Sequence, residues 1–92
     1  MYLFLLSQEA NQQPGSIVAC IVVAPNMETA PYVHPDSSML WMPYDNCWGK
    51  SMFDHAMPCE DTIWCHPHNV QVEFLGEASD HLDPGTLLAT RR

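Results

Sequence analysis

Positively charged residues are scarce in this sequence of 92 residues. Lys50, Arg91 and Arg92 face 11 Asp and Glu residues, so the net charge at pH 7 is −8. A protein that binds nucleic acid through its phosphates needs Lys and Arg residues clustered on one surface. We therefore expect no direct contact with nucleic acid, and a pocket for a nucleotide messenger is disfavoured for the same reason.

A long hydrophobic run is also missing. The first six residues are apolar, but Ser7, Gln8 and Glu9 interrupt them, and no basic residue precedes them. A membrane-spanning helix needs roughly 20 apolar residues, and a signal peptide needs a basic start. We expect no membrane association and a cytoplasmic location. In that compartment the four cysteines are expected to be thiols or metal ligands, because disulfides are rare there.

Four stretches have the pattern of β-strands. Residues 2–8 are almost continuously apolar, which is typical of a strand that is buried on both faces. Residues 16–24 are rich in β-branched side chains, and Pro14-Gly15 between the two runs predicts a turn, so residues 2–24 are expected to form a hairpin. Apolar and polar residues alternate over residues 70–74, and a last short strand is expected over residues 86–90.

One short helix and one long loop are expected between these strand pairs. Asn26 is a suitable N-cap for a helix that starts at Met27, and Pro31 limits that helix to one or two turns. Residues 35–68 are rich in Pro, Trp, Cys and His and are predicted to form a long loop or insertion. The expected fold is α+β: a single domain over residues 1–92 with one small antiparallel sheet in the order β-β-α-long loop-β-β, and the helix packed on one face.

Two stretches of the chain resemble a family of small, mostly uncharacterised proteins of phages and prophages. The first begins with Tyr-Leu-Phe-Leu-Leu-Ser-Gln at residues 2–8 and includes His34-Pro35-Asp36 after the expected helix. The second is Val-Gln-Val-Glu-Phe-Leu-Gly-Glu-Ala at residues 70–78, followed by Pro84-Gly85 and the closing strand. The resemblance covers roughly half of the chain. It implies an accessory protein encoded by a phage, and it implies no established activity.

Thiol and imidazole side chains are concentrated between residues 47 and 68. Zinc prefers these two kinds of ligand, and a metal ion would hold a long loop together. No Cys-x-x-Cys spacing is present, so small buried cysteines and exposed histidines are the alternative interpretation. The expectation is therefore no cofactor, with zinc as an alternative whose candidate ligands are Cys47, His55, Cys59, Cys65, His66 and His68.

Acidic residues interleaved with aromatic ones suggest a surface that binds another protein. An unneutralised negative surface accelerates association with basic surfaces, and aromatic side chains serve as apolar anchors in interfaces. The candidate partner-binding residues are Asp54, Glu60, Asp61, Glu73, Glu77, Asp80, Asp83, Trp41 and Trp48. Solubility and core filling are the alternative explanations of the acidic and aromatic residues, respectively.

Together these features predict a non-enzymatic binding protein. No grouping of residues has the signature of a nucleophile, a base and an oxyanion site, so no catalytic residue is assigned. We expect a phage-encoded protein that inhibits a basic nucleic-acid-handling protein or ribonucleoprotein of the host cell, such as a CRISPR or restriction system. The alternatives are a zinc-stapled module and an oligomeric sponge for a small signalling molecule.

Overall fold

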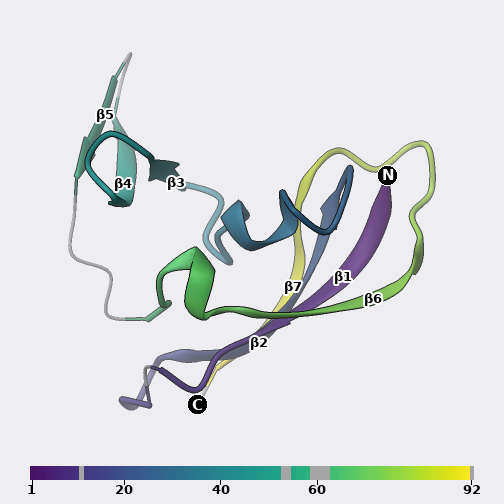
Figure 1. Ribbon diagram of the computed structural model, residues 1–92, viewed down its shortest axis with the longest axis horizontal. Coiled ribbons are helices and arrows are strands. Elements are labelled where there is room, and N and C mark those ends of the chain that lie inside the picture. Colours follow the sequence, from purple (N-terminus) through teal and green to yellow (C-terminus); the bar gives the residue numbers. More distant parts are fainter. Residues whose placement is uncertain (11, 53–54, 59–62, 92) are drawn as a thin grey trace.

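Two antiparallel β-sheets and two short 3-10 helices make up the computed structural model of this protein (Figure 1). The structure describes residues 1–10, 12–52, 55–58 and 63–91, and for residues 51, 52, 55 and 56 it describes the backbone alone. One sheet has four strands and is called the large sheet below. The other has three strands and is called the small sheet.

The large sheet is built on the hairpin formed by β1 (Tyr2–Ser7) and β2 (Ile17–Ala24). Gly15, in the turn between these strands, has a φ of 87°, a conformation that glycine adopts without the strain of a side chain. β6 (Gln71–Glu77) pairs with β1, and β7 (Gly85–Arg91) pairs with β2, so the strand order is β6-β1-β2-β7. Residues 78–84 connect the two outer strands around one end of the sheet (Figure 1).

One face of the large sheet carries the hydrophobic core. Phe4 is paired with Val22, and Leu6 is paired with Cys20, so these four buried side chains lie on the same face. The same core includes Ile17 at the start of β2, together with Ala24, Ala30, Trp48 and Trp64. The hairpin and the two outer strands therefore agree with the strands that the sequence predicts.

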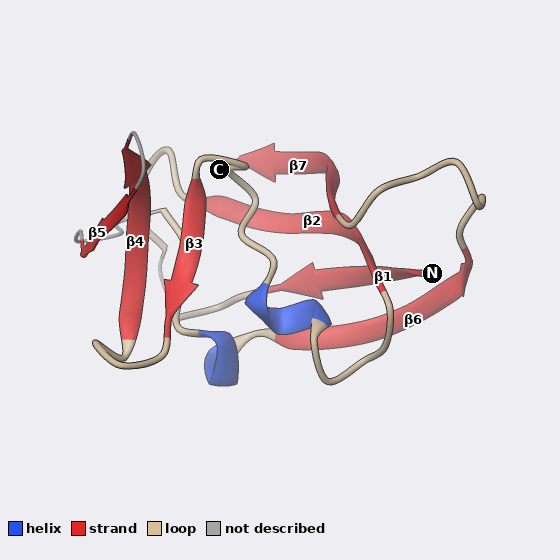
Figure 2. Ribbon diagram, turned by 90° about the horizontal axis from the view of Figure 1, so that it is seen from above, coloured by secondary structure: helices blue, strands red, loops and turns tan. Residues whose placement is uncertain are grey.

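The small sheet consists of β3 (Met39–Met42), β4 (Cys47–Met52) and β5 (His55–Pro58), in that order. Asn46, with a φ of 52°, turns the chain from β3 into β4. Trp41 on β3 lies directly across from Trp48 on β4, with ring centroids 5.3 Å apart. The strands of the small sheet run across the direction of the strands in the large sheet (Figure 2).

Residues 63–65 join the two sheets. The Ile17 amide donates to the carbonyl of Ile63 at 2.9 Å, and the buried Gln8 amide group donates from Nε2 to the carbonyls of Ile17 and Ile63. Trp64 follows directly and is among the most deeply buried side chains of the core. The indole of Trp48, on the small sheet, donates from Nε1 to the carbonyl of Cys65 at 2.8 Å, so residues 63–65 are bonded to both the hairpin and the small sheet.

The expected α+β fold with a single sheet is wrong. The described residues contain no α-helix, because the predicted helix from Met27 is replaced by a turn and by the 3-10 helix η1 (Ala30–Tyr32). Asn26 does cap this turn, accepting a hydrogen bond from the Thr29 amide at 2.9 Å, but Pro31 prevents a longer helix. The predicted long loop over residues 35–68 contains the small sheet and part of the second 3-10 helix, η2 (Pro67–Asn69).

Over the part of the chain described above, no helix has the length and apolar character that crossing a membrane requires.

Candidate functional site

A pocket with a volume of about 260 Å³ opens between the segment that follows η1 and the first residues of β7. Thr86 pairs with the buried Val22, so its side chain lies on the core side of the large sheet, where its hydroxyl bonds to the carbonyl of His34. Aromatic, aliphatic and small polar residues line the pocket: Tyr32, Val33, His34, Ser37, Met39, Leu40, Trp41, Pro84, Gly85 and Thr86.

Two aromatic rings form one wall of this pocket. The rings of Tyr32 and Trp41 are tilted against each other, with centroids 6.0 Å apart. Tyr32 is 51% exposed and Trp41 is half-buried, so both rings are reachable from solvent. Trp41 is held from behind by Trp48 and by His66, whose ring centroid is 5.1 Å away. The aromatic wall is therefore supported by the core and still open to a ligand.

Hydrogen bonds to His34 fix the opposite side of the pocket. The Asp36 amide donates to Nδ1 of His34 at 2.8 Å, and the Thr86 hydroxyl donates to the His34 carbonyl at 2.8 Å. The His34 ring is buried and packs edge-on against Trp48, with centroids 4.8 Å apart. These contacts join the segment after η1 to β7.

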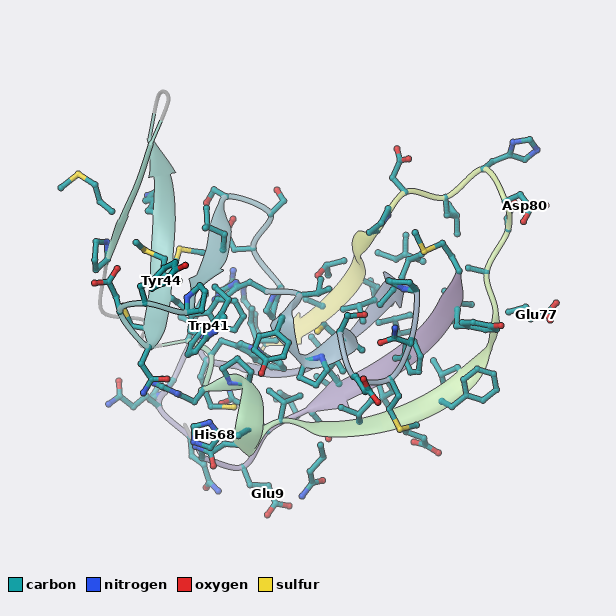
Figure 3. The ribbon with its side chains drawn as sticks, turned by 45° about the horizontal axis from the view of Figure 1, so that its top comes forward. Glu9, Trp41, Tyr44, His68, Glu77 and Asp80 are labelled. Atoms are coloured by element: carbon teal, nitrogen blue, oxygen red, sulfur yellow. The ribbon has the colours of Figure 1, made fainter. Side chains whose placement is uncertain are left out.

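Two carboxylates adjoin lining residues of the pocket in sequence: Asp83 directly precedes Pro84, and Asp36 directly precedes Ser37. Asp80 and Glu77 lie farther away, at the opposite end of the molecule from Trp41 (Figure 3). All four of these carboxylates are exposed. Asp36 accepts hydrogen bonds from the amide and hydroxyl groups of Ser38 at 2.9 and 2.8 Å, and these bonds lower the pKa of Asp36 below its ordinary value. The Asp36 carboxylate therefore carries full negative charge at pH 7.

The predicted partner-binding residues lie in different environments in the structure. Glu73, Glu77, Asp80 and Asp83 are exposed, and Trp41 lines the pocket. Trp48 is only 3% exposed, so it belongs to the core and is not available as a docking anchor. The remaining three candidates, Asp54, Glu60 and Asp61, lie outside the described residues.

The predicted zinc ligands are only partly brought together. His66 and His68 are neighbours, with ring centroids 5.0 Å apart, while Cys65 is buried and Cys47 is half-buried on β4. Cys59 and the side chain of His55 lie outside the described residues. Among the side chains that are described, no three His, Cys, Asp or Glu residues converge as metal ligands. The zinc site stays a prediction.

Sequence reasoning missed Tyr32 and His34 as site residues. The sequence places them in a short segment between Pro31 and Pro35, which has no strand or helix periodicity. What makes them a site is the hydrogen bond from Thr86, a residue 52 positions away. The one local signal was Trp41, which sequence analysis did select.

Comparisons of the chain with protein-family models, with curated proteins and with solved structures give no match.

Proposed function

We propose that this chain is a non-enzymatic binding protein that docks its acidic surface on a basic protein, and that the pocket accepts a Lys or Arg side chain of that partner. The observation that carries the proposal is the position of the aromatic pocket beside Asp83, at the end of the 78–84 connection. Tyr32 and Trp41 form the wall of the pocket, and Asp83 precedes its lining residue Pro84.

The chemistry of the pocket matches a cationic side chain. A Lys or Arg group over an aromatic ring gains about 0.5–2 kcal/mol, depending on how far it is desolvated. Exposed carboxylate pairs add about 0.2–1 kcal/mol each. The net charge of −8 also accelerates the encounter with a basic surface. The aromatic pocket would fix the position of the cationic side chain, and the carboxylates would attract it.

A defined probe tests this proposal: a short peptide rich in Lys and Arg, compared with the same peptide carrying Gln at those positions. Chemical shifts of the indole groups should respond to the basic peptide alone. The Tyr32→Ala variant should bind about 5- to 30-fold more weakly, since it removes half of the aromatic wall. Tyr44→Ala is the matched control, because Tyr44 is fully exposed on the β3–β4 turn, outside the pocket lining (Figure 3).

A second matched pair tests the charge. Asp83→Asn should weaken binding of the basic peptide at low salt, while Asp45→Asn, on the β3–β4 turn, should have a smaller effect. Raising the salt concentration from about 0.1 to about 1 M should lower the affinity 10- to 1000-fold if four or five carboxylate pairs contribute. Equal effects of Tyr32→Ala and Tyr44→Ala, or binding that is indifferent to salt, would contradict the proposal.

The partner class that we propose is a nucleic-acid-handling protein of a host cell, with inhibition of a phage-defence system as the outcome. The excess of negative charge and the resemblance to phage proteins support this class. Capture from a bacterial lysate at moderate salt, with wild type and Tyr32→Ala compared by mass spectrometry, tests it. If no nucleic-acid-binding protein is captured by wild type and lost with Tyr32→Ala, the result counts against this partner class.

Structural zinc binding is a second proposal, and the pair His66 and His68 favours it. Nδ1 of His66 is buried and has no hydrogen-bond partner among the described residues, and the two rings are 5.0 Å apart. Elemental analysis of protein purified without chelator tests this directly. Less than about 0.2 equivalents of zinc in wild type would reject it, and His68→Ala should lower the content while His81→Ala, in the 78–84 connection, should not.

A further inference from the structure

The outer edge of β7 forms one border of the large sheet and is open. Strand β7 pairs with β2 on one side only (Figure 2), and among the described residues no other segment forms main-chain hydrogen bonds with it. Residues 87–91 are all exposed. An edge strand of this kind presents a row of unpaired N–H and C=O groups to solvent, and these groups can pair with an added strand.

The two outer strands of the large sheet differ in how their edges are protected. Each carries one β-bulge, at Leu75 on β6 and at Leu87 on β7, so the bulges do not distinguish them. The charges do, because β6 carries Glu73 and Glu77, whereas β7 has no charged residue before Arg91. Charged side chains are a common protection of a strand edge against pairing. β7 is therefore the less protected edge of this sheet.

The pocket lies at the start of this edge. Gly85 and Thr86, the first two residues of β7, line the pocket, and Asp83 lies two positions before Gly85. The Thr86 side chain lies on the core side of the sheet, because Thr86 pairs with the buried Val22. Side chains directly opposite each other on paired strands point to the same face. A residue paired with Thr86 on an added strand would therefore point to the side on which the pocket lies.

We infer that the basic partner binds through an extended segment, which pairs with the outer edge of β7 as a fifth strand of the large sheet and places a Lys or Arg side chain in the pocket. This inference rests on the proposed function and adds to it the conformation of the bound segment. In strand addition, main-chain hydrogen bonds supply affinity, and pockets for alternate side chains supply specificity. The aromatic wall and Asp83 favour a cationic side chain opposite Thr86.

A second copy of β7 does not supply this cation. If two β7 strands paired in antiparallel fashion around Leu88, Arg91 of one copy would lie opposite Gly85 of the other. Gly85 pairs with Val23, on the face of the sheet opposite the core cluster, so Arg91 would point away from the pocket. Arg91 also donates from Nη1 to the carbonyl of Gly15 at 3.1 Å within its own chain. The occupant that fits both the edge and the pocket is therefore an extended segment of a different, basic protein.

A synthetic peptide of the same length as β7 tests the inference. It alternates Thr and Val, has blocked ends, and carries Lys at the penultimate position, which lies opposite Thr86 in an antiparallel pairing. Two N-methylated forms are compared with it: one is methylated at the Thr amides, and the other at the Val and Lys amides. The N–H groups of successive residues on a strand point to opposite edges, so only one of the two forms loses the hydrogen bonds to β7.

Binding of each peptide is followed by the change in indole fluorescence. We expect one N-methylated form to bind at least about tenfold more weakly than the parent peptide, and the other to bind within about threefold of it. Hydrogen exchange supplies a matched control within the protein. The amide protons of β7 that do not bond to β2 should exchange more slowly in the complex, whereas those on the outer edge of β6 should be unchanged.

The same peptide with Gln in place of Lys separates this inference from the proposed function. Equal binding of both N-methylated forms, with the Lys peptide still preferred over the Gln peptide, would overturn strand addition and support the cationic pocket. One tolerated N-methylated form, with the Lys and Gln peptides bound equally, would overturn the cationic pocket and support strand addition at β7. No binding of the parent peptide up to about 1 mM would overturn the inference. So would slow exchange of the β7 amide protons in concentrated protein without peptide, because that result would assign the edge to a second copy of the chain.

Discussion

The two sheets of this protein bury their side chains in different ways. The large sheet supplies a continuous set of aliphatic and aromatic residues to the core, from Phe4 and Leu6 on β1 to Ile17, Cys20 and Val22 on β2. The small sheet supplies one fully buried side chain among its described residues, Trp48, with Met39 and Trp41 packed partly against the core. One sheet is stabilised by many small contributions and the other by a single large side chain.

This difference teaches how a segment rich in proline can be ordered without a core of its own. The Trp48 ring packs edge-on against His34 and Trp41, and its Nε1 donates to the carbonyl of Cys65 at 2.8 Å. These contacts attach the small sheet to the large one at both the side-chain and the main-chain level. The pocket lies at the same junction, so its shape depends on that attachment.

Among the predicted variants, substitution of Trp48 is expected to lower the free energy of unfolding most. Trp48→Ala should cost about 3–5 kcal/mol of unfolding free energy, because it leaves a large cavity between the sheets. The measurement is the urea midpoint followed by circular dichroism. Trp48→Phe is the control: it keeps an aromatic ring but loses the hydrogen bond to Cys65, and should cost less. A loss below about 1 kcal/mol for Trp48→Ala would show that the small sheet is attached by other means.

The cysteine thiols of the two sheets should differ in their rate of alkylation. Burial raises the pKa of the Cys20 thiol from 9.0 to about 12, whereas Cys47 on the small sheet is half-buried. At pH 8 a shift of this size leaves Cys20 with about a thousandfold less thiolate than an ordinary thiol, so alkylation should label Cys47 well before Cys20. Mass spectrometry of digested, time-quenched samples measures this. Equal labelling rates would mean that the large sheet opens as readily as the small one.

The same pKa shift has a consequence for stability at alkaline pH. The folded-state pKa of Cys20 is above the unfolded value, so its contribution to stability is complete below about pH 9 and is lost as the pH rises toward 12. The Cys20→Ala variant should lack this alkaline loss. An unchanged pH profile in that variant would place the loss on other groups.

Gly49 tests how tightly the small sheet is packed within itself. A Cβ atom at this position would lie 2.9 Å from Cγ of Met42 and 3.0 Å from the carbonyl oxygen of Met57. Gly49→Ala should therefore cost about 1–3 kcal/mol. The double variant Gly49→Ala with Met42→Ala should lose less unfolding free energy than the two single variants together, because the shorter side chain at position 42 makes room for the new Cβ atom. Additive losses would show that the two side chains do not compete for the same space.

Substitution of Asp36, which precedes the small sheet, should have the smallest effect on stability. Its bonds to Ser38 hold its pKa below the ordinary value, so the stability that they contribute is present above about pH 4 and is lost as the pH falls through the folded-state pKa. Asp36→Asn should cost about 0.5 kcal/mol at pH 7 and less at about pH 3. Urea midpoints at the two pH values provide the measurement, and a cost that persists at the lower pH would assign the effect to something other than the charge.

The large sheet was predictable because its signals are local. The β-branched run of β2, the apolar run of β1 and the Pro14-Gly15 turn specify a hairpin without reference to the rest of the chain. The small sheet was not predicted, because Pro43 and Pro58 at the ends of its strands gave the segment the pattern of a loop. The prediction that residues 2–8 are buried on both faces was only half right, since Leu3 and Leu5 are half-buried.

The sequence by itself determined the hairpin, the two outer strands and the acidic excess, because each of these depends on composition or on neighbours within a few positions. Tertiary structure alone decided that Trp48 is core and Trp41 is pocket, although both are tryptophans on paired strands. It also decided that Thr86 closes the pocket through His34. Burial and long-range hydrogen bonds depend on which segments meet in space, and no local pattern in a single sequence records that.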